Sequence, residues 1–159
     1  MGAPAPSLRQ PQSPADWGRA RALIEEYAAA LGHDLSFQNI AHELENLAAE
    51  YSAPDGAFLL AWEREACLGC VGVRRFAPGD GEIKRMYVVP AARGRGIGLM
   101  LARAIVAEAR RLGYARLLLD TLSFMQEAQS LYASLGFRRI EAYRFNPLPG
   151  ATYYELRLA

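Results

Sequence analysis

Hydrophobic residues recur at two different spacings along the chain, and the spacing changes near residue 57. Before that point they repeat every three or four positions, which is typical of amphipathic helices. One helix is predicted to begin with Ser13 as its N-cap and Pro14 at its first position, and to end at Gly32. A second helix is predicted over about residues 39–49. The first third of the chain is therefore predicted to be mainly helical.

After residue 57, short apolar runs separated by turn-forming residues predict a series of strands. One long helix interrupts this series after Gly98, and another helix ends at Gly136. Hairpins at both ends, with a β-α-β unit between them, predict a single α/β (α+β) domain over residues 1–159 with a mixed sheet and helices on both faces. The predicted strands cover about residues 57–62, 66–73, 83–89, 116–120, 138–145 and 152–158, with a short additional strand at 8–10.

The composition fits one globular domain. Of the 159 residues, 52% are hydrophobic and 22% are charged, the formal net charge is +1, and Lys84 is the only lysine. Such a balanced charge gives no overall field that attracts nucleic acid or an anionic membrane. No apolar run approaches the roughly 20 residues of a membrane span, and the N-terminus lacks the pattern of a secretory signal. We therefore expect a cytoplasmic protein with a flexible segment at residues 1–6.

The two cysteines, Cys67 and Cys70, form a C-x-x-C pattern of the kind found in redox and zinc sites. A structural zinc site takes about four protein ligands, but the chain has no second cysteine pair, and His33 and His42 are distant in sequence. A redox C-x-x-C opens a helix after a strand, whereas this one lies inside a run that predicts a strand. We therefore expect two core thiols and no metal site.

The stretch with the most chemical content joins the strand at 83–89 to the long helix. Glycines let the backbone approach a ligand closely and adopt positive φ, and the first turn of a helix presents free N–H groups and a partial positive charge. Together these features predict an anion site suited to phosphate, with two arginines at its rim. The loop contains Arg93, Gly94, Arg95, Gly96 and Gly98.

Other interpretations of this loop require different residues. A P-loop ends in Gly-Lys-Ser/Thr, but here Gly98 is followed by Leu99 and Met100. A dinucleotide-binding fold needs an acidic residue about 20 residues on, which Asp120 supplies, but its glycines follow G-x-G-x-x-G rather than the G-x-G-x-G found here. A tight turn without a ligand does not need three glycines and two arginines at one helix start. The dinucleotide fold and the empty turn stay open as weaker alternatives.

The loop and a second motif resemble the GNAT superfamily of N-acetyltransferases. Arg93, Gly96 and Gly98 match the R/Q-x-x-G-x-G/A signature of that superfamily in place. Residues 82–88 look like its fourth strand, and residues 128–137 look like its A-x-x-L-Y-x-x-x-G-F helix end. The resemblance implies a mainly antiparallel central sheet in which one parallel pair of strands splays apart.

This resemblance implies an enzyme that transfers the acetyl group of acetyl-coenzyme A to a primary amine by direct attack, without a metal. In the family, amides of the loop hold the pyrophosphate of the coenzyme, and backbone groups of the preceding strand pair with its pantetheine arm. Carried to this chain, the coenzyme-binding residues are Met86, Tyr87, Val88, Arg93, Gly94, Arg95, Gly96, Ile97, Gly98 and Leu99.

The resemblance also implies two catalytic residues. Tyr132 matches a tyrosine that points at the coenzyme sulfur, so it is the candidate acid for the leaving thiolate, with a purely structural core residue as the alternative. Glu82 stands where some members carry a glutamate, so it is the candidate base, with a solvated residue at a strand start as the alternative. One departure is Met125, where many members have an asparagine that helps to bind the coenzyme. We expect that contact to be lost or replaced.

The acceptor site is expected opposite the coenzyme, between the first two helices and the last hairpin. No acidic cluster indicates a polyamine as the acceptor, and no repeated basic patch indicates a nucleic acid. A small-molecule amine is favoured over a protein N-terminus or lysine. Two alternatives stay open: a non-catalytic sensor of acyl-coenzyme A, and a dinucleotide-dependent oxidoreductase. An exposed last strand could pair two copies into a homodimer. The candidate substrate residues are Phe37, Gln38, Tyr143 and Asn146.

Overall fold

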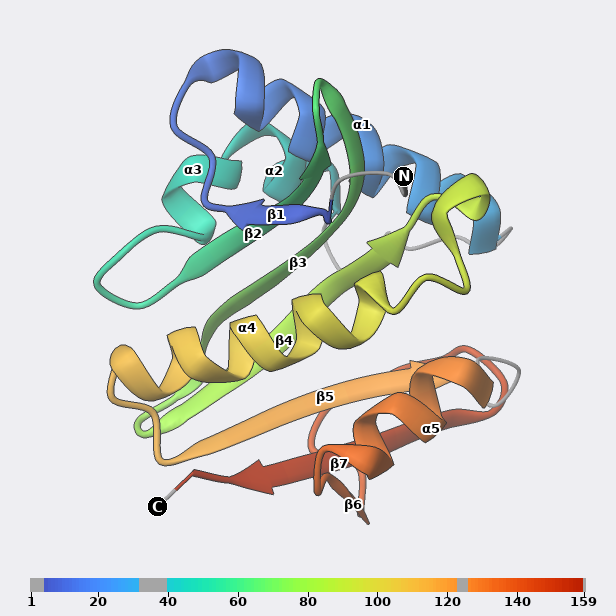
Figure 1. Cartoon of the computed structure of the whole chain (residues 1–159). Helices are drawn as coiled ribbons and strands as arrows, with labels where there is room; N and C mark the ends of the chain where they lie inside the picture. Colours follow the sequence, from blue (N-terminus) through green and yellow to red (C-terminus); the bar gives the residue numbers. More distant parts are fainter. Residues whose placement is uncertain (1–4, 32–39, 123–125, 159) are drawn as a thin grey trace.

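The structure of the protein is a computed structural model that describes residues 5–31, 40–122 and 126–158 (Figure 1). Within these ranges seven strands form one sheet in the order β1-β2-β3-β4-β5-β7-β6. Neighbouring strands run antiparallel except β4 and β5, which are parallel. The predicted mixed, mainly antiparallel sheet is therefore confirmed. The strands are β1 (Ser7–Arg9), β2 (Ala57–Glu63), β3 (Ala66–Ala77), β4 (Asp80–Val88), β5 (Arg116–Leu122), β6 (Arg138–Ile140) and β7 (Ala151–Arg157).

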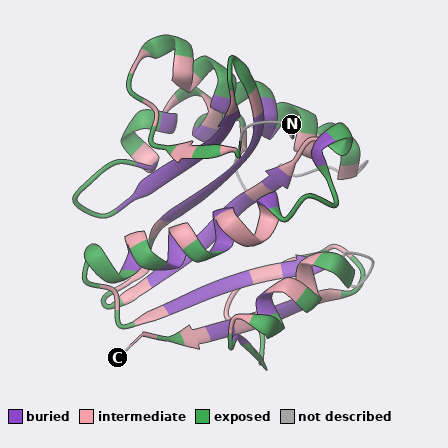
Figure 2. Ribbon diagram, in the orientation of Figure 1, coloured by how far each residue is buried: buried purple, intermediate pink, exposed green. Residues whose placement is uncertain are grey.

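Helices cover both faces of this sheet, as predicted. Strand β2 shows why both faces need a cover, because Leu59 packs into one hydrophobic core whereas Phe58 and Leu60 pack into the other. All three side chains are buried, and Figure 2 shows the same burial along the central strands. One face carries α4 (Ile97–Arg111) and α5 (Gln126–Ser134), and the other carries α1 (Pro14–Leu31), α2 (Ile40–Glu45) and α3 (Leu47–Glu50) (Figure 1).

The helical part of the prediction is right in its first element and wrong in its second. Ser13 caps α1 as expected, since its Oγ accepts a hydrogen bond from the Asp16 amide at 3.1 Å. The single helix predicted over residues 39–49 is instead divided at Asn46 into α2 and α3. The Asn46 side-chain amide donates to the His42 carbonyl at 2.9 Å, and an asparagine that bonds to nearby backbone competes with regular helix hydrogen bonding.

The C-terminal part also differs from the prediction. β6 ends at Ile140, so Tyr143 and Asn146 lie in the loop between β6 and β7 rather than in or next to a long strand. β7 is not an exposed edge strand, because it pairs with β5 along its whole length and with β6 over three residues. The edge position belongs to the short β6. A homodimer stays a prediction, but pairing through a free last strand is no longer a reason for it.

The parallel strands β4 and β5 stay together only briefly. Their register runs from Asp80 opposite Arg116 to Glu82 opposite Leu118, and beyond that point the two strands diverge (Figure 1). On its other side β4 contains a bulge, where the register with β3 shifts and Arg85 takes a φ of 62°. A left-handed conformation is uncommon for a residue with a side chain. The splayed parallel pair implied by the family resemblance is therefore present.

A buried ion pair joins α2 to this bulge. Glu43 is 2% exposed and accepts hydrogen bonds from Arg85 at 2.7 and 3.0 Å and from Arg74 at 3.0 Å. Burial alone would raise the pKa of the Glu43 carboxyl. The hydrogen bonds and charges of Arg85 and Arg74 outweigh burial and hold that pKa below its usual value. The carboxylate is therefore ionised in the folded protein at neutral pH.

Replacing Glu43 with glutamine is expected to destabilise the protein, because it removes the carboxylate that neutralises the buried Arg85 guanidinium. Breaking a buried pair in this way costs about 3–5 kcal/mol of unfolding free energy. Since the pKa of Glu43 is lowered on folding, its stabilisation is present above the unfolded value and is lost as the pH falls through the folded value. Urea unfolding between pH 7 and pH 3 should therefore show the gap between wild type and variant narrowing in acid.

The matched control is Glu45→Gln, which changes an exposed glutamate on the same short helix. It should alter the unfolding free energy by less than about 0.5 kcal/mol. Equal losses in the two variants would show that the Glu43 pair has no special part in stability.

Candidate functional site

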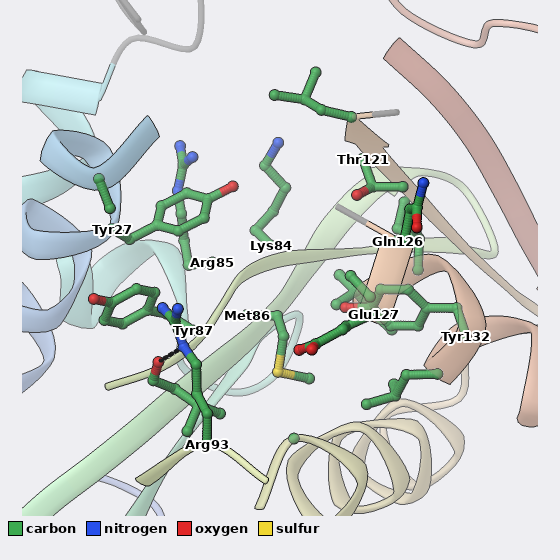
Figure 3. Close-up of a pocket in the computed structure, with 18 of the residues that line it drawn as sticks. Tyr27, Lys84, Arg85, Met86, Tyr87, Arg93, Thr121, Gln126, Glu127 and Tyr132 are labelled. Atoms are coloured by element: carbon green, nitrogen blue, oxygen red, sulfur yellow. Dashed lines mark hydrogen bonds between the residues drawn. The ribbon is translucent and has the colours of Figure 1, made fainter. Parts of the chain in front are cut away.

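A pocket of about 810 Å³ occupies the place where β4 and β5 diverge (Figure 3). Pockets that hold small molecules and cofactors have volumes of about 300–1,000 Å³. The walls come from β4, the glycine loop, α4, α5, the end of β5 and α1. The pocket therefore brings most of the predicted site residues together, namely Met86, Tyr87, Val88, Arg93, Gly94, Gly96, Ile97, Gly98, Leu99, Tyr132 and Asn146.

Other predicted residues lie elsewhere. Arg95 turns away from the pocket and forms an ion pair with Glu63 at the end of β2. Glu82 and Tyr143 are not among the described residues that line the pocket, although Tyr143 lies in the same loop as Asn146. Phe37, Gln38 and Met125 lie outside the described residues.

One long wall of the pocket is the free edge of β4. Beyond Glu82 this edge has no strand partner on the β5 side among the described residues, so an extended ligand can pair with its backbone. The end of the edge is fixed by Arg93, whose Nε donates to the Val88 carbonyl at 3.0 Å. The same guanidinium lies 5.6 Å from the centroid of the Tyr87 ring. Arg93 therefore ties the glycine loop to β4 in addition to lending it charge.

The glycine loop forms the anion-binding end of the pocket. Gly94 and Gly96 have φ values of 81° and 79°, which glycine adopts at little cost. Gly96 is the N-cap of α4, so the free amides of the first helical turn follow it directly. A Cβ at Gly98 would lie 3.3 Å from Cδ1 of Leu131, which explains why α4 can approach α5 closely here. These amides and the positive end of the helix suit a phosphate.

Tyr132 reaches the same pocket from α5. It is 4% exposed, and its ring packs edge-to-face on Phe137 with centroids 5.4 Å apart. Burial, with a smaller contribution from nearby Tyr27, raises the pKa of Tyr132 well above its usual value. The hydroxyl is therefore protonated at neutral pH, as a general acid must be.

Glu82 is buried just outside the pocket. It is 1% exposed, so the alternative of a solvated residue at a strand start is wrong. Each of its carboxylate oxygens already accepts a hydrogen bond, one from the Tyr143 hydroxyl at 2.8 Å and one from Arg144 at 2.9 Å. Direct contact between Glu82 and a substrate in the pocket is therefore not part of this arrangement.

The opposite end of the pocket carries a charged pair that the sequence did not assign to the site. Lys84 from β4 and Asp120 from β5 both line it, with Nζ and Oδ1 3.7 Å apart and side chains 3% and 7% exposed. Asn146 donates its amide to Asp120 at 3.0 Å. The signal in the sequence was that Asp120 interrupts an otherwise apolar part of β5, and it was considered only for a dinucleotide fold.

The cysteines behave as core thiols rather than as a site. Cys70 is fully buried, and its thiol donates to the Arg85 carbonyl at 3.2 Å. Cys67 is half-buried, and both are free. In the described part of the chain no three potential metal ligands come together. None of the described helices combines the length and the apolar character that crossing a membrane requires.

A sheet that splays beside a glycine-rich helix start is the arrangement that the family resemblance implied. The sequence profile described as "Acetyltransferase (GNAT) family" matches residues 19–137, so the chain belongs to the GNAT family of acetyltransferases. It is similar to an N-acetyltransferase of Schizosaccharomyces pombe, with 39% identity over 155 residues that cover 96% of this chain and 95% of that protein. The predicted family and enzyme class are therefore confirmed.

Solved structures show the same fold. An acetyltransferase of the GNAT family from Staphylococcus aureus Mu50 superposes with a TM-score of 0.80 at 21% identity, covering 98% of this chain and 100% of that one. An acetyltransferase of Salmonella typhimurium, solved with acetyl-CoA as its cofactor, superposes with a TM-score of 0.70 at 23% identity, covering 98% and 95%. Family members of this fold are thus seen with the expected co-substrate.

The glycine loop allows a matched test of phosphate binding. Gly96 in the loop and Gly79 in the turn before β4 both have a φ of 79° and open space where a Cβ would stand. Alanine at either position should cost about 1–2 kcal/mol of stability, because a left-handed conformation is unfavourable for an L-residue. Only Gly96→Ala should also weaken binding of coenzyme A, measured by isothermal titration calorimetry. Similar affinities for the two variants would place the phosphates elsewhere.

Proposed function

We propose that this protein is an N-acetyltransferase that moves the acetyl group of acetyl-coenzyme A to a primary amine of a small molecule by direct attack. The observation that carries the proposal is that one pocket joins an anion-binding helix start to a buried tyrosine and a charged pair. The residues present fit the co-substrate. Amides after Gly96 suit its pyrophosphate, and the free edge of β4 around Met86 suits its extended amide-containing arm.

In the proposed reaction an acceptor ammonium first loses a proton to a base, and the free amine attacks the acetyl carbonyl carbon. A C–N bond forms, and the C–S bond of the tetrahedral intermediate then breaks. The Tyr132 hydroxyl gives its proton to the departing sulfur and regains one from the attacking nitrogen. The products are an N-acetyl amine and a free thiol. The position of Tyr132 in the lining of the pocket supports this role, and its hydroxyl is protonated at neutral pH as the role requires.

Glu82 is the proposed base, and the structure constrains how it acts. Because Glu82 does not line the pocket, the proton would travel through water or through the Tyr143 hydroxyl that already donates to the carboxylate. At the end of such a relay the Glu82 carboxylate holds the proton, and Arg144 pairs with the carboxylate again once that proton is released. Glu82 would therefore receive the proton of the ammonium without touching the amine itself.

The acceptor end of the pocket favours a small molecule over a protein. Lys84 and Asp120 are almost fully buried, so only a slender group reaches them. A non-catalytic sensor is less well supported, because a sensor has no need of a protonated tyrosine in the pocket. A cytoplasmic location fits the two free thiols, since reducing compartments keep cysteines unpaired.

Thermal unfolding with acetyl-coenzyme A, coenzyme A, NADH and ATP in parallel tests the ligand class. A ligand that binds only the folded state raises the midpoint, and the shift grows with concentration above Kd. Both forms of coenzyme A should raise the midpoint, and NADH should not. A shift with NADH and none with either coenzyme form would instead support the dinucleotide-dependent oxidoreductase.

Replacing Tyr132 with phenylalanine is expected to lower kcat for thiol release, because the leaving sulfur loses its proton donor while the ring that packs on Phe137 is kept. Loss of general acid catalysis typically costs about 10²–10⁴-fold. Thiol release at saturating acetyl-coenzyme A and amine measures the effect directly.

The control is Tyr154→Phe, which removes a hydroxyl from β7 outside the pocket. Tyr154→Phe should leave kcat nearly unchanged. Glu82→Gln removes the proposed base and should lower kcat, but it should not alter the affinity for coenzyme A because Glu82 does not line the pocket. An unchanged kcat for Tyr132→Phe would show that Tyr132 is not the general acid that protonates the departing sulfur.

A further inference from the structure

The ion pair of Lys84 and Asp120 is unusual among the buried charges of this protein. Its Nζ–Oδ1 distance of 3.7 Å exceeds hydrogen-bond length, although both side chains are almost completely buried. By contrast, Arg85 and Glu43 form a close pair with two hydrogen bonds of 2.7 and 3.0 Å. A buried ammonium needs close acceptors to replace the water it has lost. At this separation the donors of the Lys84 ammonium are not used up by Asp120 and can bond a ligand group in the pocket.

The two members of the Lys84–Asp120 pair differ in how many hydrogen bonds the protein gives them. Asp120 is held by Asn146, whose own side-chain oxygen accepts the Leu148 amide at 3.0 Å, so the amide orientation is fixed. Among the described residues, Asp120 is the one ion-pair partner of the Lys84 ammonium, and they supply it with no hydrogen bond. In Figure 3 Lys84 rises from β4 between Tyr27 and Arg85 on one side and Thr121 on the other.

The buried charges nearest to this pair are already compensated by partners of their own. Arg85 is paired with Glu43, and Arg144 is paired with Glu82. A simple cationic amine bound at Asp120 would place a second ammonium next to Lys84 without a second anion. An acceptor with one ammonium and one carboxylate adds no net charge and meets both members of the pair. The match between the two charges of the pair and the two charges of the acceptor would favour such a ligand over an uncharged or singly charged one of similar size.

We propose that the Lys84–Asp120 pair is the acceptor subsite and that the acceptor is a zwitterionic amino acid, with its carboxylate on Lys84 and its ammonium on Asp120. This inference rests on the proposed function and names its substrate class. Tyr27, Leu31 and Leu148 also line this pocket and are available to contact the side chain of the amino acid. Asp120 thereby brings the nitrogen that will attack into the pocket shared with Tyr132.

The test compares the twenty L-amino acids with their α-amides as acceptors for thiol release, using wild type, Lys84→Gln, Lys84→Arg and Asp120→Asn. The quantity that decides is the ratio of kcat/KM for an acid to that for its own amide. Lys84→Gln should lower this ratio about 10- to 100-fold, as expected for loss of a charged hydrogen bond. Lys84→Arg keeps the positive charge but should not restore the ratio, because its guanidinium would close on Asp120 and occupy the donors that the substrate carboxylate needs.

Asp120→Asn should behave differently from Lys84→Gln. Acid and amide both carry the ammonium, so both should lose at least about 10-fold in kcat/KM while their ratio stays nearly constant. Arg103→Gln, which removes a positive charge from an exposed position on α4, is the control and should change neither quantity. Thermal shifts with coenzyme A identify any variant that has lost its fold.

A second readout needs no turnover. Because Lys84 is the only lysine, lysine-selective ¹³C labelling gives a single Cε resonance for the side chain in question. In the protein loaded with coenzyme A this resonance should shift further at saturation with an accepted amino acid than with its α-amide, because only the acid places a carboxylate on Lys84. Equal shifts would contradict the assignment.

The outcomes separate the two proposals. Thiol release with amides or simple amines but not with amino acids, or equal losses for acids and amides in Lys84→Gln, would overturn the zwitterion assignment and leave the acetyltransferase standing. No thiol release from any acceptor, with the Cε resonance still shifted by amino acids, would overturn the enzyme and keep the binding site.

Discussion

The feature on which the rest of the structure depends is the early separation of β4 from β5. The two strands are paired only as far as Glu82, and immediately beyond it β4 is bent by a bulge at Arg85. Glu43 holds that bulge from α2 through two hydrogen bonds to the guanidinium. The backbone edge released by the separation faces the pocket, and the glycine loop follows where β4 ends. One irregularity in a sheet thus creates both a free strand edge and the space beside it.

This origin explains why the charged residues fall into two kinds. Most buried carboxylates near the point where β4 and β5 separate form ion pairs with arginine side chains. These pairs link neighbouring elements of the fold. Lys84 and Asp120 stand on the two strands just after they part, so no backbone hydrogen bonding fixes the distance between them. The arginine–carboxylate pairs hold together the elements around the pocket, whereas the Lys84–Asp120 pair lines the pocket itself. The arginine-bonded carboxylates are Glu43 with Arg85 and Arg74, Glu82 with Arg144, and Glu155 with Arg116 and Arg138.

The sequence predicted what is local and missed what depends on distant contacts. The strand, the glycine loop and the helix start at Gly96 are consecutive, so the order of residues alone indicates their chemistry. Tyr132 belongs to a second local motif. The burial of Glu82 depends on Tyr143 and Arg144, which arrive from a loop that was predicted to lie partly in a strand. No spacing rule in the sequence links these residues, because the turn of the chain after Ile140 brings them together.

The acceptor subsite proposed above would account for lysine at position 84 in a chain whose other basic residues, apart from two histidines, are arginine. A guanidinium is a planar fork that bonds a carboxylate through two nitrogens, as Arg116 does with Asp80 at 2.9 and 2.7 Å. An arginine facing Asp120 would close the pair in this manner and occupy both its own donors and the carboxylate. A compact ammonium on a flexible stem neutralises Asp120 at a distance and keeps its three donors for another anion. With lysine at this position, Asp120 compensates the buried ammonium while the ammonium can still bond an anionic group of a ligand.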